Sequence, residues 1–201
     1  MYLTPQGTGW IEVICGSMFS GKTEELIRRL RRARIAQQNV RIFKPAIDRR
    51  YDDTDIVSHS DQRILSRVVA RAEEILDHCP TAVQVVGIDE AQFFETELVH
   101  VCRELARRGV RVIVAGLEQD YRTEPFDTMR AMMVEAEYLT KSLAICVICG
   151  NPAVRNQRLS KKSGQIVVGG SDTYEARCRR CYQAAASEPE LFEEPRAEEV
   201  P

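Results

Sequence analysis

Residues 16–23 read GSMFSGKT and fit the pattern G-x-x-x-x-G-K-[ST] of a phosphate-binding loop without a mismatch. Such a loop must connect the end of a buried strand to the beginning of a helix. The flanking sequence supplies both elements. WIEVIC at 10–15 is a short apolar run typical of a buried strand, and residues 23–38 have a helical composition with apolar residues on one face. The loop therefore predicts an α/β chain that binds a nucleoside triphosphate, but it does not identify the phosphate acceptor.

The fixed positions of this loop each contribute to phosphate binding. Gly16 and Gly21 let the backbone turn its N–H groups inward, toward phosphate oxygens. Lys22 is expected to reach the β- and γ-phosphates, and Thr23 to offer its hydroxyl to Mg²⁺. The predicted ATP-binding residues of the loop are Gly16, Ser17, Met18, Phe19, Ser20, Gly21, Lys22 and Thr23.

The rest of residues 1–140 alternates predicted strands with predicted helices. The further strands are expected at 40–45, 82–90 and 110–118, and the further helices at 64–79, 95–108 and 128–139, with a polar loop at 46–61. This alternation indicates parallel β-α-β units in a doubly wound sheet. The predicted fold class is α/β, a P-loop (RecA-like) parallel sheet flanked by helices.

Two adjacent carboxylates close the strand predicted at 82–90, at the edge where open α/β sheets bind their ligands. Asp89 ends the strand, and a strand-end Asp usually holds Mg²⁺ in this fold. Glu90 beside it can align a water for hydrolysis or accept a proton from an alcohol as general base. A purely structural Glu is a third interpretation, and the pair alone does not separate an ATPase from a kinase.

The seven cysteines are of two kinds. Four of them form two C-x-x-C pairs with 28 residues between the pairs: Cys146, Cys149, Cys178 and Cys181. Such pairs can close a tetrahedral Cys₄ site that suits Zn²⁺, and four thiolates leave no open position for water, so a structural zinc is predicted. A redox dithiol is the alternative. The remaining three are predicted to be inert buried thiols: Cys15, Cys79 and Cys102.

The cysteine pairs define a second unit at 141–186, which we interpret as a small zinc-binding lobe. The tail at 187–201 is acidic and contains Pro, so we predict that it is disordered. Binding both ends of the intervening 28 residues to one metal would turn them into a positioned lid. Within this lid, Gly169 and Gly170 permit close approach of the backbone to a ligand, and Tyr174 could stack on a flat group or simply pack.

The composition argues against several classes of protein. The chain of 201 residues is 44% hydrophobic and 29% charged, as is common for globular proteins, and it has no apolar run long enough to span a membrane. Its formal net charge of −2 argues against a general attraction to nucleic acid or to anionic membranes. The N-terminus lacks the features of a signal peptide, so a cytoplasmic location is expected.

Taken together, GSMFSGKT, IDEAQFF, the two C-x-x-C pairs and GGSDTYEARCRRC resemble the thymidine kinases of the zinc-containing type II family, over about residues 9–183. The resemblance implies transfer of the γ-phosphate of ATP to the 5′-hydroxyl of thymidine, or of deoxyuridine. The products would be dTMP and ADP, in nucleotide salvage. The resemblance also implies a homotetramer, feedback inhibition by dTTP, and a zinc lobe that carries a lasso loop over the nucleoside.

The resemblance also assigns roles to individual residues. Glu90 matches the catalytic base, Asp48 matches a residue associated with Mg²⁺ alongside Thr23 and Asp89, and Arg50 matches a phosphate contact. The ATP-binding set outside the loop is then Asp89, Gln92 and Arg50. The expected nucleoside pocket, including the lasso backbone within 165–174, is formed by Met18, Phe93, Leu117, Tyr121, Phe126, Val167, Gly169, Gly170 and Tyr174.

Some questions stay open at this level. Asn156 stands where many members of the family have a Thr near the thymine methyl, so the preference among 5-substituted pyrimidine nucleosides is undetermined, as are the roles of residues 52–55 and of the tail. One alternative function is a zinc-ribbon P-loop NTPase that acts on nucleic acid, which the net charge disfavours. Another is a nucleotide-sensing regulator of a protein partner, which the pairing of Asp89 with Glu90 disfavours.

Overall fold

The computed structural model describes residues 5, 7–46, 55–57, 63–159 and 171–183. Several residues of the predicted sites lie outside this part of the chain: Asp48, Arg50, Val167, Gly169 and Gly170. Most of the acidic stretch 52–55 and the whole tail at 187–201 also lie outside it. The predictions made for these residues therefore stay predictions.

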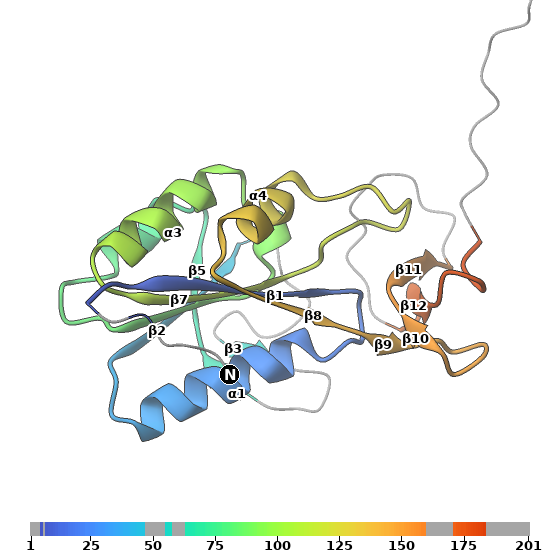
Figure 1. Cartoon of the computed structure of the whole chain (residues 1–201), viewed down its shortest axis with the longest axis horizontal. Helices are drawn as coiled ribbons and strands as arrows, with labels where there is room; N and C mark the ends of the chain where they lie inside the picture. Colours follow the sequence, from blue (N-terminus) through green and yellow to red (C-terminus); the bar gives the residue numbers. More distant parts are fainter. Residues whose placement is uncertain (1–4, 6, 47–54, 58–62, 160–170, 184–201) are drawn as a thin grey trace, which may run out of the picture.

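A six-stranded sheet in the order β5-β2-β6-β7-β1-β8 forms the centre of the fold (Figure 1). Every pairing within it is parallel, which confirms the predicted α/β class with a P-loop parallel sheet. Its strands are β1 (Trp10–Gly16), β2 (Val40–Pro45), β5 (Arg67–Val69), β6 (Val85–Ile88), β7 (Arg111–Gly116) and β8 (Tyr138–Ser142).

Helices cover both faces of this sheet. Figure 1 shows α1 (Lys22–Ile35) on one face, and α3 (Glu97–Arg107) and α4 (Asp127–Glu135) on the other. Successive side chains of β1 follow this division, since Val13 packs in one core cluster and Ile14 in the other. Covering both faces explains why the central strands are almost wholly apolar. Because every pairing in the sheet is parallel, the carboxyl ends of its strands all lie at one edge.

The helix predicted over residues 64–79 is wrong. The segment contains β4 (Arg63–Leu65), the edge strand β5 and only a short helix, α2 (Glu74–Asp77), while β3 (Asp55–Val57) from the predicted loop pairs with β4. The β-branched residues of β5 favour an extended backbone, and parallel pairing with β2 supplies hydrogen bonds that a local sequence pattern does not reveal. Leu65, which a helix over this segment would be expected to bury, is 70% exposed.

The helix predicted over residues 128–139 was extended too far. The helix ends at Glu135 as α4. The strand β8, which the sequence did not predict, begins at Tyr138 and pairs with β1. The segment YLTKS has no continuous apolar run, because an edge strand is only partly buried. β8 continues to Ser142, just past the boundary predicted at 140, and the division into two domains stays a prediction.

A lobe of short strands lies beyond the carboxyl ends of β1 and β8 (Figure 1). Two antiparallel pairs build it: β9 (Ala144–Ile145) with β10 (Pro152–Ala153), and β11 (Arg155–Arg158) with β12 (Tyr174–Arg177). Among the described residues of the lobe, the buried core cluster consists of three alanines and two cysteines, which is too small a core to fold by apolar burial alone. In the described part of the chain, no helix has both the length and the apolar character that crossing a membrane requires.

Candidate functional site

The phosphate loop is shaped by backbone conformations that few residues adopt. Gly16 has φ 147°, and a Cβ atom there would lie 2.3 Å from the carbonyl oxygen of Ser142 in β8. Gly21 precedes α1 with φ 79°, and Phe19 adopts φ 62° although it is not a glycine. The turn therefore needs glycine at two of its fixed positions, and it leaves the first N–H groups of α1 facing the loop.

Donor groups of this loop converge on one backbone carbonyl. Lys22 Nζ and Ser20 Oγ each donate a hydrogen bond to the carbonyl oxygen of Ser17, both at 2.7 Å. The ammonium group is thus held inside the loop rather than extended into solvent. A phosphate group entering the loop would find this positive charge and the helix N-terminus on the same side.

Asp89 and Thr23 meet although they are far apart in the sequence. Asp89 follows β6 and is 6% exposed, and one of its oxygens accepts a hydrogen bond from Thr23 Oγ1 at 3.2 Å. Its other oxygen accepts one from the backbone N–H of Glu90 at 3.0 Å. A carboxylate and a hydroxyl are the oxygen ligands that Mg²⁺ prefers, and adjacent ligands of an octahedral Mg²⁺ lie about 3 Å apart. The two side chains therefore suit a shared magnesium ion.

Glu90 adopts a left-handed backbone conformation, with φ 50° and ψ 41°. Its carboxylate accepts a hydrogen bond from Gln92 Nε2 at 2.5 Å, and Gln92 Oε1 accepts one from the backbone N–H of Leu117 at 2.9 Å. Gln92, in the short helix η1 (Ala91–Phe93), is itself buried. It therefore connects Glu90 to the end of β7. The contact with ATP predicted for Gln92 stays a prediction, and in this structure its side chain bonds to the candidate base.

A cleft brings the loop, Glu90 and the end of β7 together. Its lining residues are Met18, Phe19, Ser20, Gly21, Lys22, Thr23, Glu24, Glu90 and Leu117. The cationic end of the cleft is provided by the loop, and an apolar contribution comes from Met18 and Leu117. Such a cleft can hold a polyphosphate close to a carboxylate. Its apolar part can contact a flat apolar group of a ligand.

The aromatic residues expected near the nucleoside fall into two groups. Tyr121 and Tyr174 meet at Arg158, whose guanidinium carbon lies 3.5 Å from the centre of the Tyr121 ring and whose Nη2 donates to the Tyr174 hydroxyl at 2.9 Å. Phe93 and Phe126 are half-buried and are not among the residues that line the cleft. Sequence reasoning missed Arg158, because a single Arg in a polar strand gives no sign that two tyrosines surround it.

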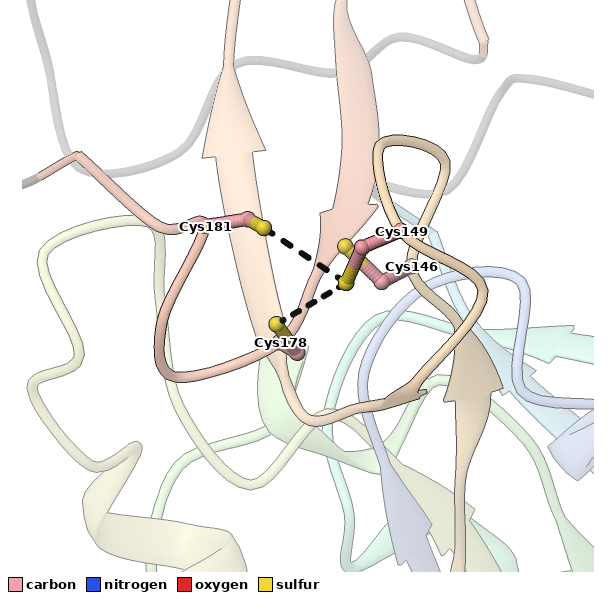
Figure 2. A group of neighbouring side chains, drawn as sticks. All are labelled: Cys146, Cys149, Cys178 and Cys181. Carbon is pink, nitrogen blue, oxygen red and sulfur yellow. Dashed lines mark hydrogen bonds between the residues drawn. The ribbon is translucent and has the colours of Figure 1, made fainter.

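The four paired cysteines form one cluster, as Figure 2 shows. Their sulfur atoms all lie within 4.8 Å of one another, and Cys149 Sγ is 3.6 Å from Cys178 Sγ and 3.5 Å from Cys181 Sγ. Cys146 and Cys149 come from the turn after β9, where Gly150 adopts φ 73° and donates its N–H to the carbonyl of Cys146. The cluster could hold a metal ion.

Local hydrogen bonds set the acidity of these thiols. Burial raises the pKa of Cys146, but surrounding backbone N–H groups, with Cys178 first among them, outweigh it and lower the pKa to about 6. A backbone hydrogen bond from Asn151 lowers the pKa of Cys149 in the same way. The pKa of Cys181 is raised to about 12, first by its hydrogen bond with Cys149. Thiolates, which a lowered pKa favours, are the form in which cysteine binds a metal.

The three lone cysteines are buried, which confirms that prediction. Burial, reinforced by the carboxylate of Glu118, raises the pKa of Cys15 to about 12, and burial raises that of Cys79 to about 11. Burial also raises the pKa of Cys102 well above its usual value. These thiols stay protonated at neutral pH and are therefore poor nucleophiles and poor metal ligands.

The fold and this site define a nucleotide-binding protein of the P-loop class with a four-cysteine lobe. Comparison with known proteins makes the assignment more specific, since a sequence model described as "Thymidine kinase" matches residues 9–182. A "Thymidine kinase" from Rhodothermus sp. (strain ITI 518) is 59% identical over 175 residues, which cover 87% of this chain and 82% of that protein. One from Bdellovibrio bacteriovorus is 50% identical over 183 residues, which cover 91% and 90% of the two chains. The chain belongs to the thymidine kinase family.

Proposed function

We propose that this protein is an ATP:thymidine 5′-phosphotransferase, which converts thymidine, and also deoxyuridine, to the 5′-monophosphate in nucleotide salvage. The observation that carries the proposal is the placement of Glu90 in the same cleft as Lys22 and Thr23 of the phosphate loop. An enzyme that transfers phosphate to an alcohol needs a proton acceptor next to the phosphates, and this cleft contains a carboxylate in that place. Family membership supports thymidine as the alcohol.

In the proposed reaction, the 5′-oxygen of thymidine forms a bond to the γ-phosphorus of ATP. The bond from that phosphorus to the bridging oxygen breaks, and ADP leaves. Glu90 accepts the proton of the 5′-hydroxyl, while Gln92 holds its carboxylate in place through the hydrogen bond at 2.5 Å. Lys22 exchanges its contact with the Ser17 carbonyl for the β- and γ-phosphates. The loop N–H groups offset the charge on the transferring group.

We assign the magnesium that accompanies ATP to Thr23 and Asp89, with Asp48 as a further predicted contact. When bound, Mg²⁺ would supply positive charge that offsets the negative charge developing on the phosphates. The hydroxyl and carboxylate oxygens at 3.2 Å support this assignment. Arg50 is proposed as a phosphate contact on the same grounds of family resemblance as Asp48.

We assign a structural Zn²⁺ to the four-cysteine cluster. Sulfur atoms around a tetrahedral Zn²⁺ with bonds of about 2.3 Å lie about 3.8 Å apart, close to the separations of 3.5 and 3.6 Å between Cys149 and its neighbours. The metal would join the ends of β9 and β12 and so anchor both ends of the lasso, residues 150–177. We propose that the lasso, with Val167, Gly169, Gly170 and Tyr174, closes over the base and excludes water, which competes with thymidine as acceptor.

Family resemblance extends the proposal in four further respects. The nucleoside pocket would comprise Met18, Phe93, Leu117, Tyr121 and Phe126 with the lasso. dTTP would act as feedback inhibitor, the protein would assemble as a homotetramer, and it would work in the cytoplasm. No nucleic acid or membrane partner is needed for this activity.

The proposal is tested by incubating the protein with γ-labelled ATP, Mg²⁺ and a panel of nucleosides, and by following labelled nucleoside monophosphate. We expect transfer to thymidine and deoxyuridine, and a loss of about 10²- to 10⁴-fold in kcat for Glu90→Gln with ADP binding retained. Glu95→Gln is the matched control, because Glu95 is an exposed carboxylate that is not part of the cleft lining. Loss of ATP that is independent of nucleoside and stimulated by DNA would instead indicate the nucleic-acid-dependent NTPase. ATP binding without turnover would indicate the regulator.

A further inference from the structure

Asn156 joins the lobe to the phosphate loop. It lies in β11 and is 2% exposed. Its Oδ1 accepts a hydrogen bond from the backbone N–H of Met18 at 2.8 Å, and its Nδ2 donates one to the carbonyl oxygen of Gln119 at 3.0 Å. This orientation of the amide is set by its partners, because the backbone N–H can only donate and the carbonyl can only accept. One buried side chain therefore connects the lobe, the phosphate loop and the segment after β7.

A second contact connects the same parts of the molecule. Phe19, the residue next to Met18, packs against the core of the lobe, which contains Cys146 and Cys178. Phe19 is also the non-glycine residue of the loop with a left-handed backbone, at φ 62°. Strained conformations of this kind persist only where the surrounding structure holds them. Here the surrounding structure is the lobe, which contacts the loop on both sides of the peptide bond between Met18 and Phe19.

We propose that Asn156 is a positioning residue for the donor site, which holds the middle of the phosphate loop in its nucleotide-binding shape through Met18. The lobe then supports ATP binding directly, in addition to carrying the lasso over the nucleoside. This inference rests on the proposed function only in assigning ATP to the loop. The hydrogen bond that carries it is a property of the protein without any ligand.

The first test measures amide hydrogen exchange at residues 17–19 in the ligand-free protein. Replacing Asn156 with Ala removes the acceptor of the Met18 N–H, so exchange there is expected to become at least about tenfold faster. The matched control is Gln157→Ala, since Gln157 is the next amide in β11 but accepts its hydrogen bond from the backbone N–H of Gln183. We expect the control to exchange like the native protein at residues 17–19.

The second test compares the affinity for Mg²⁺ and ADP with the two Michaelis constants. For Asn156→Ala we expect about tenfold weaker ADP binding in the absence of nucleoside, and higher KM values for both ATP and thymidine, because Met18 belongs to the phosphate loop and to the proposed nucleoside pocket. Asn156→Ser, whose short hydroxyl cannot reach both partners, is expected to show the same direction, and it replaces the Ala variant if that protein does not fold. Metal content and thermal unfolding report whether each variant is folded.

The outcomes separate this inference from the proposed function. Unchanged exchange at residues 17–19 would overturn it whatever the activity, and so would faster exchange with unchanged ADP affinity. Failure of the native protein to bind ADP would refute the proposed function, while the exchange data would still decide whether Asn156 holds Met18.

Discussion

The backbone of Glu90 offers a direct test of how the site is built. With φ 50° and ψ 41°, Glu90 adopts a conformation that costs an L-residue other than glycine about 1–2 kcal/mol. Two hydrogen bonds hold it there, one from its own N–H to Asp89 and one from the N–H of Phe93 to its carbonyl oxygen. We infer that this strain accompanies the turn that brings the carboxylate into the cleft.

Comparing Glu90→Gly with Glu90→Ala isolates the strain. Both changes remove the carboxylate and its hydrogen bond from Gln92, so these losses cancel between the two variants. In regular structure, glycine is less stable than alanine by about 0.5–1 kcal/mol. At Glu90 we expect the reverse order, with the glycine variant more stable by about 1 kcal/mol, which corresponds to about 2–4 °C in Tm for a chain of this size.

Two positions outside the site provide controls of opposite sign. Gln37 is exposed after the end of α1 and has φ 58°, so glycine should again be more stable than alanine there. Arg28 lies exposed within α1, where glycine should be less stable than alanine by about 1 kcal/mol. Neither control position is part of the cleft lining, so activity should be retained in all four of these variants.

The assay is thermal unfolding without ligand, combined with phosphoryl transfer to thymidine. Both Glu90 variants should lose about 10²- to 10⁴-fold in kcat, because neither retains a proton acceptor. Backbone strain at Glu90 is ruled out if Glu90→Ala is as stable as Glu90→Gly while the control variants at Gln37 and Arg28 behave as expected. The assignment of the base is refuted if either Glu90 variant keeps kcat within about tenfold of the native value.

Two further predictions concern the acid stability of the sheet and the metal of the lobe. Burial raises the pKa of Glu12, but hydrogen bonds from Arg111 and Trp10 and the charge of Arg29 outweigh it and hold the pKa below its usual 4.5. Glu12 therefore stabilises the fold above pH 4.5 and loses this effect as the pH falls through its folded pKa. Glu12→Gln should lower the free energy of unfolding by about 2 kcal/mol at pH 7, as expected for lost hydrogen bonds to a charged group, and by progressively less below pH 4.5. An equal loss at pH 7 and below pH 4.5 would contradict this. Cys178→Ser should abolish the proposed zinc binding and raise KM for thymidine by about tenfold or more, as metal analysis and kinetics would show. Unchanged values would argue against a structural metal.

The phosphate loop shows how much local sequence can predict. Strand, loop and helix follow one another within residues 10–35, so the pattern of apolar residues and glycines is enough to predict all three. The parallel sheet could be predicted for the same reason, since strands that alternate with helices have few other ways to bury both faces. The two C-x-x-C pairs predicted a metal cluster because short, rigid turns present their thiols together.

Edge elements could not be predicted in this way. β5 and β8 are short, mixed in composition and only partly buried, and each is a strand because its backbone pairs with a neighbour distant in sequence. The helix predicted over 64–79 was wrong for this reason. Periodicity reports which faces are buried, and at an edge it carries little information about hydrogen bonding.

The sequence by itself determined the chemical groups of this protein: the loop that binds phosphate, the adjacent carboxylates and the four thiols. The tertiary structure decided how they are held. It set Gln92 between Glu90 and Leu117, Arg158 between two tyrosines, and Asn156 between the lobe and Met18. Apart from the hydrogen bond between Gln92 and Glu90, these contacts join residues 16 to 138 positions apart. Local patterns cannot report them, because a polar side chain finds its partner only after the strands have brought distant backbone groups together.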